Sequence, residues 1–391
     1  MRARTITVQN KSMPTIAKTM NVAFLGGAFD SAVGRAHRAA IELDQRFELV
    51  SGCFSRSLES SQGSAIKYGI SPERAYGSID NLLSAELNNL DAIVILTPQD
   101  QHGAQVQTCL DAGIPVICEK ALVGSVDEAI TIQDKIQTNG GFLAVTYNYT
   151  GYPIIRELRY MIQQGRLGKI QQIQIEMPQE GFSRLGSDGL PLSPQAWRLT
   201  DLSIPTLSLD LGVHVHMMIA FLTGETPIEL VATTNTYGNF KTIKDSVSCI
   251  ANYSNELTCN VWYTKCALGH RNGLKLRVFG DLGSAEWLQE RPEHLHMADK
   301  SGNRLTIDRS TNGIEIANQT RYTRFKAGHP AGFIEAFANY YYDVADALEN
   351  HQSEINRKNE YVFGIDQSIE GLRMLSAISD SSKNKRWESL V

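Results

Sequence analysis

The chain has 391 residues, 42% of them hydrophobic and 20% charged, so it is long enough for two domains with buried cores. Its formal net charge of -5 gives no electrostatic reason to expect nucleic-acid binding, and no apolar run approaches the roughly 18 residues of a membrane-spanning helix. The six cysteines form no C-x-x-C pair and several lie in apolar runs, which indicates reduced core residues and a cytoplasmic protein.

The first 19 residues carry several basic side chains and no acidic one. This composition is weakly similar to that of a transit peptide, but we favour an extra arm, or a misplaced start upstream of Met20. An apolar core of the kind found in secretion signals is absent, so secretion is not expected. We therefore treat residues 1–19 as an N-terminal arm.

A glycine-rich turn follows the first apolar run. Residues 21–25 read as a buried strand, residues 26–34 read GGAFDSAVG, and a helical pattern leads to a second strand at residues 47–54. This strand–turn–helix–strand order is the context that a dinucleotide-binding fingerprint requires. The glycines would let the backbone approach a pyrophosphate at the helix N-terminus. The loop is longer than in G-x-G-x-x-G, so an ordinary tight turn remains the alternative.

Further strand and helix patterns alternate up to residue 148. Helices are expected at residues 78–87, 102–113 and 125–140, and strands at residues 91–96, 115–119 and 142–146. Such alternation predicts a doubly wound parallel sheet.

Beyond residue 149 strand patterns follow one another, which suggests an antiparallel sheet. Strands are expected at residues 170–176, 228–234, 246–253, 258–263, 275–279 and 284–288, and helices at residues 154–164, 208–222, 330–348 and 361–377. Residues 178–206 form a long loop rich in Gly, Pro and Ser, and loops of this length are often functional.

Two of the predicted parallel strands end in polar residues. Thr97-Pro98 and then His102 follow one strand, and Glu119-Lys120 end another. Ligands of open parallel sheets bind beyond the carboxyl ends of the strands. A lysine beside a nicotinamide could polarise or protonate a carbonyl oxygen, or hold an alcohol. The alternative is a solvated lysine at a strand end.

Asp210 and His214 are four residues apart on a predicted helix and so share a face. The carboxylate could orient the imidazole and raise its basicity, although a surface pair would have the same spacing. His216 lies on a different face, so the sequence predicts no metal site here.

The end of the second strand bears on the choice of cofactor. No acidic residue is present there to accept the ribose hydroxyls of NAD. Ser55, Arg56 and Ser57 could instead bind the 2′-phosphate of NADP, Arg56 by charge-assisted hydrogen bonds. An arginine stacked on adenine would suit either cofactor. We expect NADP or NAD, with NADP slightly favoured.

Taken in order, these motifs resemble those of the Gfo/Idh/MocA oxidoreductases, the family of glucose–fructose oxidoreductase and inositol dehydrogenase. The matching segments run through nearly the whole chain: Gly26 to Gly34 with His37-Arg38, Thr97-Pro98 to His102, Glu119-Lys120, Tyr147-Asn148-Tyr149, Trp197-Arg198, Asp210 to His214, and Ala327 to Pro330 before Glu335-Ala336-Phe337.

The resemblance implies an NAD(P)-binding Rossmann domain at residues 20–148. It implies a substrate-binding and oligomerisation α/β domain at residues 149–391, with a large open, mostly antiparallel sheet that commonly packs in homodimers or homotetramers. The implied reaction passes a hydride between nicotinamide C4 and a hydroxyl or keto carbon of a sugar, cyclitol or sugar derivative. No membrane or nucleic-acid partner is implied.

The resemblance also assigns roles. His214 would be the general base, Lys120 would hold and polarise the substrate oxygen, and Asp210 would orient the pair. Other substrate contacts would come from Tyr149, Trp197, Arg198 and His329. The expected cofactor contacts are Gly26, Gly27, Ala28, Ser31, Val33, Gly34, Ser55, Arg56, Thr97, Pro98, His102 and Glu119.

Two positions depart from the family pattern. Ala121 stands where proline usually follows the lysine, which makes the placement of Lys120 less firmly braced, and Leu209 stands where glycine commonly precedes the aspartate. Neither change removes a chemical group, so an active enzyme is expected. The same fold also serves NAD-dependent glycosidases that oxidise transiently and non-catalytic NAD(P)-sensing regulators, and both stay as alternatives.

Overall fold

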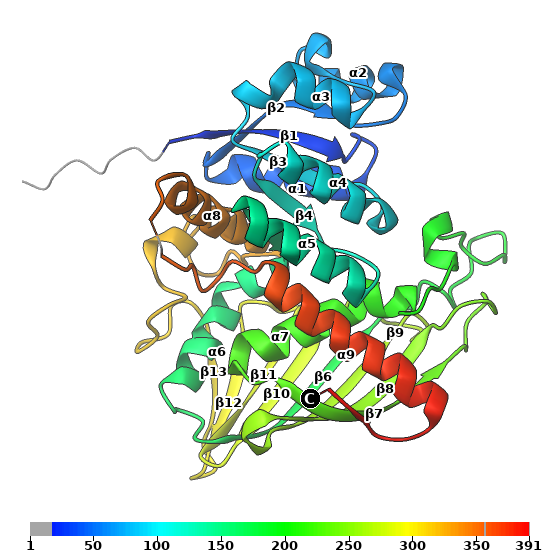
Figure 1. The fold of residues 1–391 in the computed structure, drawn as a ribbon. Helices are drawn as coiled ribbons and strands as arrows, with labels where there is room; N and C mark the ends of the chain where they lie inside the picture. The colour runs from blue at the N-terminus through cyan, green and yellow to red at the C-terminus, as the bar shows by residue number, and fades with distance from the viewer. Residues whose placement is uncertain (1–17, 356, 391) are drawn as a thin grey trace, which may run out of the picture.

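The computed structural model describes residues 18–355 and 357–390, which contain two β-sheets (Figure 1). The first is a five-stranded sheet in the order β2-β1-β3-β4-β5, and the second is a nine-stranded sheet in the order β13-β12-β11-β10-β6-β9-β8-β7-β14. The first sheet belongs to the N-terminal half, and the second forms the base of the C-terminal half.

Every strand pair in the first sheet is parallel, as the alternating pattern predicts. Its strands are β1 (Met20–Gly26), β2 (Phe47–Cys53), β3 (Ala92–Leu96), β4 (Val116–Glu119) and β5 (Leu143–Thr146). The connecting helices are α1 (Ala32–Leu43), α2 (Leu58–Lys67), α3 (Ile79–Glu86), α4 (His102–Asp111) and α5 (Val126–Asn139). All five residues of β3 are buried, which is why this strand reads as an uninterrupted apolar run.

The second sheet is antiparallel except where β6 pairs with β9 in parallel. Its strands are β6 (Ile170–Pro178), β7 (Pro227–Asn235), β8 (Ser246–Tyr253), β9 (Thr258–Thr264), β10 (Lys275–Gly280), β11 (Gly283–Leu288), β12 (Leu295–Asp299), β13 (Arg304–Ile307) and β14 (Glu388–Ser389). The helices of this half of the chain are α6 (Pro153–Gln163), α7 (Val213–Thr223), α8 (Phe333–Gln352) and α9 (Ile365–Asn384).

The second sheet has one covered and one open face. Helices α6, α7 and α9 lie along one side of it (Figure 1). On β8 the buried residues Val247, Cys249 and Ala251 alternate with the exposed residues Ser248 and Ile250. This period of two is typical of a sheet with only one face in the core.

The end of the chain returns to the N-terminal half. Helix α8 packs on α1, and the Val145 N–H of β5 donates to the Phe363 carbonyl at 2.8 Å. Residue 361 lies in a turn and residues 362–364 lie outside any helix or strand, so the last long helix begins at Ile365, later than the apolar pattern indicates. The sequence does not predict the short helix α2, the strand β12 or the two edge strands β13 and β14. In β13 the first three residues are exposed, so it lacks the apolar alternation of the inner strands.

Candidate active site

In the glycine turn after β1, main-chain atoms lie close to those of the loop after β3 and of helix α1. Gly26 and Gly27 have φ angles of 83° and 67°, in the left-handed region that favours glycine. A Cβ atom on Gly26 would lie 2.7 Å from the Thr97 nitrogen, and one on Gly34 would lie 2.2 Å from the Gly27 carbonyl oxygen. The Ser31 side chain caps α1 by accepting from the Gly34 N–H. The turn therefore lies at the N-terminus of α1, where a dinucleotide pyrophosphate would fit.

A cavity of about 770 Å³ opens beyond the carboxyl ends of β1 to β4. Most residues expected to contact a cofactor line it: Gly26, Gly27, Ala28, Ser31, Val33, Ser55, Arg56, Thr97, Pro98 and Glu119. Lys120, Trp197, Arg198 and Asp210 line it too, so the long loop and the second half of the chain close one side. Its volume is in the range of small-molecule sites.

Two residues that were expected to contact the cofactor, Gly34 and His102, are not among the residues that line this cavity. Gly34 packs on the glycine turn so closely that an added Cβ atom would overlap the Gly27 carbonyl. His102 is 1% exposed, and its Nδ1 and Nε2 atoms each lie 2.9 Å from a carbonyl oxygen, those of Ala121 and Thr97 respectively. His102 thus joins the loops that follow β3 and β4.

The segment that carries Lys120 is held from both sides. The Lys120–Ala121 peptide bond is cis, and Ala121 is buried. Glu119 accepts hydrogen bonds from His37 Nε2, at 2.9 Å, and from the Thr146 hydroxyl. Burial would raise the pKa of Glu119, but the bond from His37 and the charge of Lys120 outweigh it and lower the pKa to about 2. Contacts from His102 and His37 therefore fix the segment in which proline is absent.

Three cations meet the Asp210 carboxylate. Lys120 Nζ lies 3.1 Å from Oδ1 and 2.9 Å from the Asp210 carbonyl oxygen, while Lys265 Nζ and Arg198 Nη1 both contact Oδ2. Burial opposes ionisation of Asp210, but the charges of Lys120, Lys265 and Arg198 hold its pKa well below the usual range. The cluster therefore carries more positive than negative charge.

Lys265 was missed in the sequence. It follows β9 directly, so it is a lysine at a strand end, the signal that pointed to Lys120. It is 7% exposed, and burial and the charges of Arg198 and Lys120 lower its pKa although Asp210 opposes this. Asn272 was missed too, and its side-chain amide donates to the Tyr149 hydroxyl at 3.1 Å.

His214 lies on α7, where it is 7% exposed and packs on Tyr149 with 4.5 Å between ring centroids. Burial, with the charge of Lys120, lowers the pKa of His214 to about 3, so its ring is neutral at physiological pH. Among the described contacts, the Asp210 carboxylate bonds to cations and not to His214, unlike the pair that the spacing suggests. Asp210 lies in a π-helical turn, Ser208–Gly212, whose wider repeat changes the α-helical alignment.

The expected substrate residues are divided between two places. Trp197 and Arg198 line the cavity, and the Arg198 guanidinium lies 4.3 Å from the centroid of the Trp197 ring. Tyr149 is buried beside His214. His329 is exposed and outside the residues that line this cavity.

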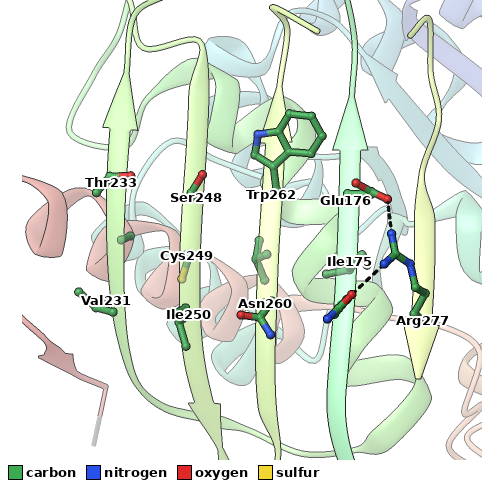
Figure 2. Close-up of a pocket in the computed structure, with 13 residues that line it drawn as sticks. Ile175, Glu176, Val231, Thr233, Ser248, Cys249, Ile250, Asn260, Trp262 and Arg277 are labelled. Atoms are coloured by element: carbon green, nitrogen blue, oxygen red, sulfur yellow. Dashed lines mark hydrogen bonds and ion pairs between the residues drawn. The ribbon is translucent and has the colours of Figure 1, made fainter. Parts of the chain in front are cut away.

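A second hollow, of about 460 Å³, lies on the nine-stranded sheet (Figure 2), and Lys120, Asp210 and His214 are not among its lining residues. Glu176, Ser248, Trp262 and Arg277 are among its lining residues, and Arg277 donates to Glu176 at 2.9 Å. The open face of the sheet thus combines an aromatic ring with polar side chains.

Within residues 18–355 and 357–390, no cluster of three or more His, Cys, Asp or Glu side chains is arranged to hold a metal ion. In the same part of the chain, no helix is both long and apolar enough to cross a membrane.

Two family models match the chain in succession. One, described as an oxidoreductase family with an NAD-binding Rossmann fold, matches residues 20–147. The other, the GFO/IDH/MocA C-terminal domain, matches residues 155–286.

Individual proteins are similar over most of the chain. An uncharacterized oxidoreductase, YfiI, of Bacillus subtilis is 26% identical over 384 residues, covering 95% of this chain and 97% of that protein. Inositol 2-dehydrogenase of Rhizobium meliloti is 24% identical over 314 residues, covering 78% of this chain and 85% of that enzyme. The solved structure of an inositol dehydrogenase homolog from Azotobacter vinelandii, complexed with NADH and myo-inositol, has a TM-score of 0.87 and 25% identity, covering 95% of this chain and 98% of that one.

Proposed function

Since the chain belongs to the Gfo/Idh/MocA family of NAD-binding oxidoreductases, we propose that it is an NAD(P)-dependent dehydrogenase acting on a hydroxyl group of a sugar, cyclitol or sugar derivative. The observation that carries the proposal is the position of Lys120. It lies at the carboxyl end of β4, on the wall of the cavity that begins at the glycine turn, and it is bonded to Asp210. A related inositol 2-dehydrogenase and the NADH and myo-inositol complex of a homolog support this substrate class.

The glycine turn and the N-terminus of α1 fit the pyrophosphate of the cofactor, and Thr97 and Pro98 border the space next to it. A bound NAD(P)⁺ supplies the hydride acceptor. The chain itself then has to hold the substrate oxygen, remove its proton and keep the carbon in place.

Lys120 is suited to hold the oxygen. Two of its contacts are to Asp210, which fixes the ammonium group while leaving a donor for the substrate. His214 is suited to take the proton, since a neutral imidazole can accept one. The hydroxyl proton becomes acidic as the C–H hydride leaves and the C=O bond forms, so a weak base is sufficient.

For the cofactor, we propose that NADP is preferred to NAD. Ser55 and Arg56 line the cavity, and Ser57 caps the N-terminus of α2, so a cation and a helix end lie where an adenosine 2′-phosphate would be. Replacing Arg56 by Ala should weaken NADPH binding about tenfold and NADH binding much less. Nucleotide fluorescence titrations measure both, and equal losses would refute the preference.

The function itself is tested by following nicotinamide absorbance with a panel of neutral sugars, sugar acids, sugar phosphates, inositols and glycosides, each with both cofactors. The expected result is net reduction of cofactor by at least one of the sugars, sugar derivatives or inositols. Cleavage of a glycoside with no net absorbance change would instead indicate a glycosidase that oxidises transiently. Cofactor binding with no turnover of any class would favour a sensing protein.

We also propose that the open face of the nine-stranded sheet packs on a second copy of the chain. Its exposed apolar groups support this: Ile250 is 44% exposed, Phe279 is 36% exposed, and the half-buried Trp262 lies on β9, the strand next to that of Ile250. Sedimentation of the wild type and of an Ile250→Glu variant tests the proposal. A dimer or tetramer that dissociates in the variant is expected, and a monomeric wild type would contradict it.

A further inference from the structure

The charge balance around Asp210 bears on the class of substrate. Lys120, Lys265 and Arg198 all contact this one carboxylate. The other acid among the described residues that line the cavity is Glu119, which already has bonds from His37 and Thr146. Three cations against two acids leave a positive surplus in a largely buried place, and an oxidised nicotinamide would increase it.

This excess of positive charge destabilises the folded chain unless a negative charge compensates for it. A buried ammonium loses its hydration and needs an opposite charge close by. Lys265 is 7% exposed, and its described partners are Asp210 Oδ2 and the face of the Phe182 ring, 5.2 Å from the ring centroid. A site for a neutral polyol would need the Lys120–Asp210 pair but neither of the other two cations.

The three cations differ in access to the cavity. Lys265 is behind Asp210 and outside the lining, whereas Arg198 lines the cavity and its side chain is 25% exposed. One nitrogen of Arg198, Nη1, contacts Asp210. Among the described contacts its other guanidinium nitrogens have no acceptor, so they remain available to a ligand.

Lys265 shares Asp210 Oδ2 with Arg198. Lys120 on Oδ1 and Lys265 on Oδ2 supply more positive charge than the carboxylate needs, even without Arg198. Without Lys265, Arg198 would be the one described cation on Oδ2, and less of its charge would remain for a ligand. Lys265 is in this sense a positioning residue, since it acts through Asp210 on Arg198.

We infer that Arg198 binds a carboxylate or phosphate group of the substrate through the guanidinium nitrogens that do not contact Asp210, which makes the substrate a sugar acid or a sugar phosphate. The inference rests on the proposed dehydrogenase function and narrows it. The anionic group lies toward the Trp197–Arg198 segment of the long loop, while the hydroxyl to be oxidised lies at Lys120. A planar guanidinium suits bidentate binding of either anion.

The test measures binding rather than turnover. D-glucuronate, D-galacturonate and D-glucose 6-phosphate are titrated against D-glucose and D-galactose by calorimetry, with and without saturating NADH. At least one anion should bind about tenfold or more tightly than its neutral partner, the size of one charge-assisted hydrogen bond. The two anions are distinguished by comparing these affinity ratios: the preferred group, carboxylate or phosphate, is the one with the larger ratio.

Variants separate the inference from general electrostatics. Arg198→Gln and Lys265→Met should each reduce the ratio of the affinities for the anionic and the neutral sugar, called the gap below, to about twofold or less. Lys169→Met removes a lysine from the surface pair with Glu256 and should leave the gap intact. A gap that survives Arg198→Gln, or anions that bind no tighter than neutral sugars, would overturn the inference. Failure to bind NADH is measured separately and would count against the dehydrogenase function instead.

Discussion

Two ion clusters, one within the C-terminal half and one shared with Lys120 of the N-terminal half, have opposite organisation. Arg309 and Glu293 are 5% and 7% exposed and form a one-to-one pair, with Arg309 Nε 2.6 Å from Glu293 Oε2. The other two guanidinium nitrogens of Arg309, Nη1 and Nη2, donate to the carbonyl oxygens of Tyr322 and His329, at 2.6 Å and 2.9 Å. Glu293 Oε1 accepts from the Ala331 N–H. All of these donors and acceptors have partners within the chain.

The Asp210 cluster is not closed in this way. Three cations share one carboxylate, and the cluster forms part of the cavity wall. The closed pair fixes the loop from residue 309 to residue 331, whereas the open cluster keeps charge and donors available to a ligand. The uncompensated charge and the free donors thus favour the Asp210 cluster, and not the Arg309–Glu293 pair, as the candidate site.

The largest effect on turnover should come from the histidine beside the open cluster. Replacing His214 by Ala removes the proposed base and should lower kcat by roughly 10²–10⁴-fold. NADH affinity should hardly change, because His214 is not among the residues that line the cofactor cavity. Steady-state kinetics and a fluorescence titration measure the two quantities.

The same helix supplies the control. His216 is 2% exposed and contacts the Met374 sulfur and Glu370, away from the cavity. His216→Ala should lower the unfolding midpoint and keep kcat per folded molecule. If both histidine variants lose turnover equally, the helix matters only as a support and the role of His214 is wrong.

A smaller effect is expected in the pH dependence. The base must be neutral, and the pKa of His214 is lowered to about 3 by burial and by the charge of Lys120. Protonation of His214 should therefore leave kcat unchanged between about pH 8 and pH 5 and reduce it only as pH approaches the lowered pKa. A pH–rate profile at constant ionic strength measures this. An acid limb near the ordinary histidine pKa, absent in a His214 variant, would contradict it.

The sequence predicts the first sheet more completely than the second. Strands buried on both faces, such as β3, read as apolar runs bounded by turns, so the parallel sheet and its glycine turn were predicted and are confirmed. The edge strand β13 is mostly exposed and gives no such pattern. The parallel pairing of β6 with β9 depends on contacts far apart in the sequence, which local patterns do not report.

The residues of the candidate site likewise include some that the sequence predicts and some that it does not. Lys120 could be predicted because a charged residue ends an apolar strand next to a turn. The contact of Lys265 with Asp210 joins residues 55 positions apart, and neither residue indicates the other. The spacing of Asp210 and His214 suggested an α-helical pair, and the π-helical turn that separates their roles has no clear sequence signal.

The most direct test compares Lys120→Met with Arg309→Met in one series of denaturation and kinetic measurements. Removing Lys120 leaves Asp210 with two cations, so the account predicts an unfolding midpoint that is unchanged or higher, and kcat lower by roughly 10³-fold. Removing Arg309 leaves Glu293 unpaired, so it predicts a loss of about 3–5 kcal/mol of stability, with kcat per folded molecule unchanged. Near-normal turnover in Lys120→Met, or a stability loss as large as that of Arg309→Met, would contradict the central claim that the Asp210 cluster is the reactive centre.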